Sequence, residues 1–98
     1  MEAEELRLDI LRSLYSERHG EKYLSYQRLR DRLSNVEDSQ LISELTTLGH
    51  LQLVEIQNGL APFLEGSNPL GWIAITDRGE AYLESFEKRR VLLLNRVL

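Results

Sequence analysis

The spacing of apolar residues changes twice along this chain of 98 residues. As far as residue 48 the apolar residues have the spacing of helices. They then form two short continuous runs, at residues 51–56 and 72–75, and from residue 77 the spacing is helical again. Apolar residues at every third or fourth position indicate amphipathic helices, whereas short runs rich in branched apolar residues indicate strands. The pattern therefore predicts an α+β domain, mostly α, with three helices, a β-hairpin and a last helix.

The first predicted helix covers residues 3–18. Leu6, Ile10 and Leu14 recur there at intervals of four and would form its buried stripe. We expect the helix to end near Gly20, because glycine readily adopts the positive φ that often follows a helix.

Two further helices are predicted before the hairpin. The second covers residues 26–33 with Ser25 as its N-cap, because a serine side chain can accept from a backbone amide in the first turn. The third runs to residue 48, with Asn35 or Asp38 as its cap and Gly49 at its end. Its outward face is predicted to carry Glu37, Ser39, Gln40, Ser43, Glu44, Thr46 and Thr47.

The hairpin between the two predicted strands has a long, apolar tip. Asn58-Gly59 is a turn signal, and the tip includes Phe63 and Leu64. An exposed apolar loop is typical of a protein contact or a pocket. The alternative is that Phe63 and Leu64 fold back onto the domain as a third strand or a plug. Trp72, at the start of the second strand, is expected in the core.

Thr76 is expected to cap a last helix that continues to the final residue, Leu98. Such a helix would be about 33 Å long, whereas a small domain is only about 25–30 Å across. Its far end would therefore extend beyond its own domain, where apolar residues need a partner. The alternative is a helix that bends or breaks at residues 87–90.

An overhanging helix of this kind predicts a homodimer. Residues 1–79 would form the main domain and residues 80–98 the dimerisation helix. The apolar seam has the alternating steps of three and four that occur in coiled coils. The predicted interface residues are Leu83, Phe86, Arg90, Leu93, Leu94 and Val97.

Charge is distributed unevenly along the chain, whose formal net charge is −4. Residues 33–77 contain no Lys or Arg, and their acidic residues are Glu37, Asp38, Glu44, Glu55, Glu65 and Asp77. Because phosphate binding depends on Lys and Arg, this acidic block limits how strongly the third helix and the hairpin can contact phosphates.

Composition and spacing exclude several kinds of site. The absence of cysteine excludes a disulfide scaffold, a thiolate zinc site and a cysteine nucleophile. His19 and His50 have no partner at ligand spacing, so no metal is expected. No cofactor or catalytic motif is present, and no apolar run approaches the roughly 20 residues of a membrane span. We expect a cytoplasmic protein that is not an enzyme and needs no cofactor.

Two segments carry a resemblance to a known family. Leu29 to Leu51 has the order helix, tight turn, helix, and closes with Leu48-Gly49-His50-Leu51. Residues 75–83 lead from the second strand into the last helix. Together they resemble the winged helix-turn-helix family, in particular the small PadR-like and MarR-like regulators. The tyrosine- and proline-containing third helix that is usual in PadR-like proteins is not present.

The resemblance implies a winged helix-turn-helix fold with a three-helix core, a β-hairpin wing and a long C-terminal dimerisation helix. It also implies a homodimeric transcriptional regulator that binds duplex DNA with its third helix in the major groove. Base-reading residues would be Ser39, Gln40, Ser43 and Thr47, since Gln, Ser and Thr can bond base edges. Phosphate contacts would come from Ser25, Tyr26, Arg28, Arg32 and Arg78.

Two alternatives remain open at this point. Arg28 and Arg32 could belong to a solvated face, paired with Asp31 and nearby glutamates. The fold could also serve as a protein-interaction module without direct DNA binding, in which the acidic third helix and the apolar wing dock a basic partner. A salt-sensitive affinity for duplex DNA would distinguish the two functions.

Overall fold

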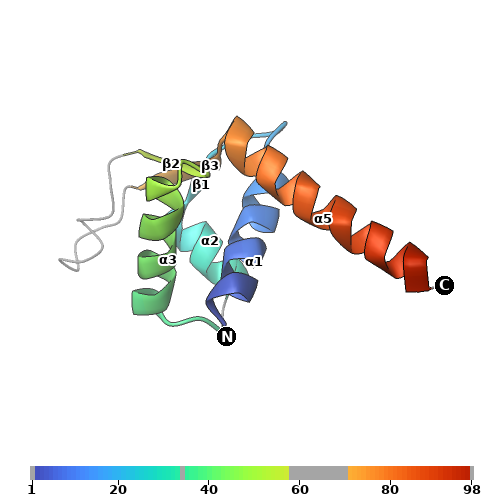
Figure 1. Ribbon diagram of the computed structural model, residues 1–98. Coiled ribbons are helices and arrows are strands. Elements are labelled where there is room, and N and C mark those ends of the chain that lie inside the picture. The colour runs from blue at the N-terminus through green and yellow to red at the C-terminus, as the bar shows by residue number, and fades with distance from the viewer. Residues whose placement is uncertain (1, 34, 58–70, 98) are drawn as a thin grey trace.

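The computed structural model describes residues 2–33, 35–57 and 71–97, with side chains up to residue 89. Within these residues the protein is a small α+β domain, mostly helical (Figure 1). Its elements are α1 (Ala3–Tyr15), β1 (Leu24–Ser25), α2 (Tyr26–Arg32), α3 (Asp38–His50), β2 (Val54–Gln57), β3 (Trp72–Ile75) and α5 (Asp77–Val97). The predicted fold class and the predicted order of helices and hairpin strands agree with this arrangement.

The three strands form one antiparallel sheet in the order β1-β3-β2. β2 pairs with β3 along its whole length, so that Gln57 lies opposite Trp72. β1 adds two pairs on the other edge of β3, Leu24 with Ile73 and Ser25 with Trp72. The sequence predicted only the hairpin, because a strand of two residues has no alternation to detect.

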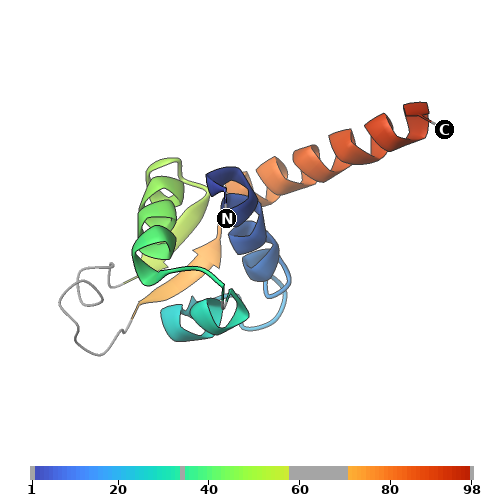
Figure 2. The ribbon, with the colours of Figure 1, turned by 90° about the horizontal axis from the view of Figure 1, so that it is seen from below.

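The core lies between the helices and the inner face of the sheet. α1 lies between α3 and α5 and packs against both (Figures 1 and 2). No buried side-chain nitrogen or oxygen among the described residues lacks a hydrogen-bond partner. The largest fully buried side chains are Leu6, Ile10, Leu11, Leu14, Leu24, Leu29, Leu41, Leu45, Leu48 and Ile73. The predicted apolar stripe of the first helix, Leu6, Ile10 and Leu14, is therefore confirmed.

Trp72 is exposed, and the expectation that it lies in the core is wrong. Its side chain is 44% exposed. Trp72 is the first residue of β3, and successive side chains of a strand point to opposite faces of the sheet. Ile73 and Ile75 are buried and take the inner face, which leaves Trp72 on the outer face.

The predicted end of the first helix is wrong, whereas the predicted start of the second helix is confirmed. α1 ends at Tyr15 instead of residue 18, and the positive φ in the following turn, 68°, belongs to Lys22 and not to Gly20. Ser25 is confirmed as the N-cap of α2, because its Oγ accepts from the backbone amide of Arg28 at 3.2 Å.

Both predicted ends of α3 are wrong. Glu37 occupies the N-cap position and makes no side-chain cap, while Asp38 is already the first helical residue, so neither Asn35 nor Asp38 caps the helix. α3 continues through Gly49 to His50, and the positive φ of 62° in the turn that follows is at Gln52. This turn also delays the next strand, which begins at Val54 rather than at residue 51.

Thr76 and Gly79 build the junction where α5 begins. Thr76 is confirmed as the cap, since its Oγ1 accepts from the backbone amide of Gly79 at 3.0 Å and donates to the backbone oxygen of Gln52 at 2.7 Å. A Cβ on Gly79 would lie 2.1 Å from the backbone oxygen of Leu53. Only glycine therefore allows α5 to begin this close to the turn before β2.

α5 is one continuous helix from Asp77 to Val97, so it does not break at residues 87–90. Leu83, 4% exposed, and the half-buried Phe86 pack its first part against the core. The second part leaves the rest of the protein and ends with no other element beside it in either view (Figures 1 and 2). The molecule is accordingly elongated, with principal extents of 51 × 27 × 22 Å.

Candidate nucleic-acid interface

The outward face of α3 is polar and accessible. Ser39, Ser43 and Thr46 are exposed, while Gln40 and Thr47 are half-buried. The Thr47 hydroxyl donates to the backbone oxygen of Ser43 at 3.2 Å, which leaves its oxygen as an acceptor. The structure thus brings the four predicted base-reading residues together on one face of α3.

Glu44 does not lie on that outward face, and this prediction is wrong. Its residue is 7% exposed, and its Oε1 accepts from Nε of Arg7 on α1 at 2.7 Å. The same hydrogen bond raises the pKa of Arg7. Between Ser39 and His50, Glu44 is the only Asp, Glu, Lys or Arg residue. With Glu44 turned inward, the outward face of α3 is neutral over this length.

Asp38, at the start of α3, is held by two side chains from α2. Its Oδ1 accepts from the Tyr26 hydroxyl at 2.8 Å and forms an ion pair with Nε of Arg30 at 2.7 Å. Tyr26 is 4% exposed, and burial, followed by the bond to Asp38, raises the pKa of its hydroxyl. The structure therefore places Tyr26 in the core and not at a position to contact phosphate.

Arg28 and Arg32 both form ion pairs with carboxylates. Arg28 Nη1 lies 3.1 Å from Glu21 Oε2, and Arg32 Nη2 lies 2.6 Å from Glu17 Oε1. The alternative of an ion-paired face is thus confirmed for these two arginines with two of the nearby glutamates, whereas Asp31 accepts from Gln27 at 3.1 Å. Exposed ion pairs contribute only about 0–1 kcal/mol, so a phosphate could replace either carboxylate.

Sequence reasoning missed Arg30, the arginine of α2 that lies nearest the start of α3. Arg32 instead faces the end of α1, where its Nη1 also donates to the backbone oxygen of Ser13 at 3.2 Å. Arg30 follows Tyr26 by four residues, and this helical spacing places both on one face. Of the other two predicted phosphate contacts, Ser25 caps α2 through its Oγ. Arg78 donates to Oε1 of Gln52 at 3.5 Å, beyond the other end of α3.

The predicted dimer residues are described only in part. Leu83 is buried against its own domain, and Phe86 is half-buried there. The side chains of Arg90, Leu93, Leu94 and Val97 lie outside the described residues, as does the apolar hairpin tip at residues 58–70. Dimerisation through α5 therefore stays a prediction.

Comparisons with known proteins identify no relative. No protein-family model matches the chain, and no curated protein or solved structure is significantly similar to it. Within residues 2–33, 35–57 and 71–97, no helix has the length and apolar character to cross a membrane. The same ranges contain no group of three or more His, Cys, Asp or Glu residues that could hold a metal ion.

Proposed function

We propose that this chain is a winged helix-turn-helix protein that binds duplex DNA as a homodimer and regulates transcription. The order of the elements and the antiparallel sheet β1-β3-β2 support this fold. α2 and α3 form the helix-turn-helix, and α3 enters the major groove. β2 and β3 form the base of the wing, and the second part of α5 joins the two subunits.

The outward face of α3 is the observation that carries the proposal. A carboxylate in the middle of a recognition helix would be repelled by the phosphates on both sides of the groove. Glu44 avoids this position because it pairs with Arg7. The side chains that remain, Ser39, Gln40 and Ser43, can donate to and accept from base edges.

The cations beside α3 predict a modest affinity. Arg28, Arg30 and Arg78 provide three positive groups per subunit, or six per dimer, at the lower end of the roughly 6–10 phosphate contacts of a typical site. All three have an internal partner, which phosphate contact would have to replace. Base contacts would then provide a large share of the specific binding energy.

The protein-interaction alternative loses part of its support, although Glu37 at the start of α3 is exposed. It relied on an acidic third helix, but Glu44 and Asp38 are both paired with arginines of the same chain. Glu55 of β2 accepts from the Tyr23 hydroxyl at 3.0 Å. The apolar hairpin tip, its other support, lies outside the described residues.

Selection from a randomised duplex library tests the proposal. We expect the wild-type chain to enrich a sequence with two-fold symmetry. Ser43→Glu should then bind the selected duplex about tenfold or more weakly, because it restores a carboxylate to the outward face. Ser85→Glu adds the same charge at an exposed position of α5, which α1 separates from α3 (Figure 1), and should bind like wild type. No enrichment, or equal binding by both variants, would contradict the proposal.

A further inference from the structure

A pocket of about 440 Å³ lies where the turn after α1 meets β2 and the start of α5. Its volume falls within the range of small-molecule sites, about 300–1,000 Å³. The turn contributes basic side chains to the lining, whereas β2 and α5 contribute carboxylates. The bases are Arg18, His19 and Lys22, and the acids are Glu55, Asp77 and Glu80. The pocket therefore lies between groups of opposite charge.

The turn that carries the bases has a well-defined backbone. The backbone amides of Gly20 and Lys22 donate to the backbone oxygen of Glu17 at 3.0 and 2.9 Å. Lys22 has a positive φ of 68° in this turn. Glycine adopts such a conformation without cost, whereas a residue with a side chain does not. The chain thus has a lysine at a position where backbone geometry alone favours glycine.

Most of the opposite charges in the pocket do not pair with each other. Arg18 and Glu80 do so, with Nε and Oε1 3.5 Å apart. Lys22, Glu55 and Asp77 form no ion pair with another described residue, although all three line the same pocket. One ammonium and two carboxylates are therefore available to a ligand that lies between them.

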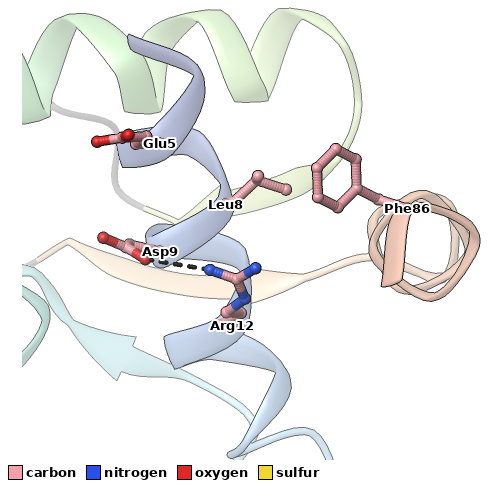
Figure 3. Close-up of a pocket in the computed structure, with 5 residues that line it drawn as sticks. All are labelled: Glu5, Leu8, Asp9, Arg12 and Phe86. Carbon is pink, nitrogen blue, oxygen red and sulfur yellow. Dashed lines mark hydrogen bonds and ion pairs between the residues drawn. The ribbon is translucent and has the colours of Figure 1, made fainter. Parts of the chain in front are cut away.

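The groove farther along α1 and α5 has the opposite arrangement. It is lined by Glu5, Leu8, Asp9, Arg12 and Phe86 (Figure 3). Arg12, the base of this lining, lies 3.4 Å from Asp9 and 2.8 Å from Glu87. Because this guanidinium is already shared between two carboxylates, the groove offers a ligand no unpaired positive group. The two charges needed for a zwitterion are available only in the first pocket of the two.

We propose that the pocket at the turn after α1 binds a free amino acid. The ammonium of Lys22 contacts the carboxylate of the ligand, and the carboxylates of Glu55 and Asp77 contact its ammonium. Ile75 also lines the pocket, which favours an amino acid with an aliphatic side chain. The site does not include α3, so this inference goes beyond the proposed function and does not depend on DNA binding.

Nuclear magnetic resonance of the isotope-labelled full chain, titrated with L-valine, tests the site. We expect saturable shifts of the backbone amide signals of Lys22 and Asp77. Two further probes each lack one charge, since N-acetyl-L-valine has no ammonium and L-valinamide has no carboxylate. Each should bind about tenfold or more weakly than L-valine, because it leaves one side of the pocket without its partner.

Lys22→Gly tests which group contacts the carboxylate, and its backbone conformation suits glycine. This variant should bind L-valine about tenfold more weakly, yet bind L-valinamide like wild type, because that probe has no carboxylate to lose a contact. Asp77→Asn should show the reverse, with weaker binding of L-valinamide and unchanged binding of N-acetyl-L-valine. The control Lys88→Ala removes the other lysine of the chain at an exposed position of α5 outside the pocket and should bind all three probes like wild type.

The outcomes decide the inference without reference to DNA. The absence of saturable shifts with L-valine would overturn it. Equal affinity of the wild type for L-valine and L-valinamide, or binding of L-valine by Lys22→Gly at wild-type strength, would overturn it too, because the site would then not recognise both charges. The dispersion of each spectrum shows whether the variant is folded. Failure of the chain to bind duplex DNA would contradict the proposed function and leave the amino-acid site unaffected.

Discussion

At the residue scale, Glu44 and Arg7 connect the candidate DNA-binding helix to the helix behind it. Among the described residues, these two form the ion pair that joins α3 to α1. The Glu44 side chain is 9% exposed and the Arg7 side chain is 27% exposed. A buried carboxylate is tolerated only when it is paired and hydrogen-bonded. The pair therefore acts together with the fully buried Leu41, Leu45 and Leu48 in keeping this side of α3 turned inward.

Glu44→Ala should lower the free energy of unfolding by about 1–3 kcal/mol, because it leaves the partly buried Arg7 guanidinium without its partner. Ser43→Ala, the preceding residue on the outward face, should change it by no more than about 0.5 kcal/mol. Urea unfolding measures both. Equal stability of the two variants would mean that the ion pair does not hold α3.

The buried Tyr26 hydroxyl predicts a loss of stability in alkali. Folding raises the pKa of Tyr26, so its contribution is complete below the unfolded value of about 10 and is lost as the pH rises above that value. We therefore compare the urea midpoint at about pH 9 and about pH 11, roughly one unit below and above the unfolded pKa of tyrosine. The midpoint should fall less over this range in Tyr26→Phe than in wild type. Parallel curves would show that Tyr26 is not protected from ionisation.

Residue-level expectations succeeded at the caps of α2 and α5 and failed where a distant partner decides. Ser25 and Thr76 were predicted as caps, because their partners lie three residues away. Glu44 was placed outside, because its partner Arg7 is on another helix and ion pairing reverses the usual preference of glutamate for water. The pairing of Arg30 with Asp38 was missed for the same reason, since only the turn between α2 and α3 brings them together.

At the element scale, helices and hairpin strands follow from apolar spacing, while short elements and helix ends do not. β1 has two residues and exists because β3 offers it an edge to pair with. α3 passes through Gly49 because the turn with positive φ is made by Gln52. Propensity places glycine at such turns, but packing decides which residue takes the position.

The junction of α5 with the turn before β2 gives the element-scale prediction. Gly79→Ala should destabilise the fold by about 1–3 kcal/mol, because its Cβ would meet backbone and the two elements must separate. Gly20→Ala is the control, since its Cβ would lie no closer than 3.7 Å to the nearest atom. Thermal unfolding compares the two, and similar transition temperatures would contradict the close approach.

At the scale of the whole molecule, α1 separates the face of α3 that we propose binds DNA from the helix α5 that we propose joins the subunits. α3 is on one side with a neutral, polar face, and α5 is on the other with its second half extending away (Figure 2). Sequence reasoning anticipated the extension from helix length alone. It could not anticipate the groove beside Leu8 and Phe86, because a groove depends on the angle at which two helices cross.

DNA binding through cations and base edges is the central claim, and fluorescence anisotropy of a labelled random-sequence duplex tests it most directly. Titration of the full chain at roughly 50 and 200 mM salt should give a micromolar affinity that falls steeply at the higher salt, because bound phosphates release counterions. Arg28→Ala should reduce the slope by about one unit. No binding at the lower salt, or binding independent of salt, would contradict the account.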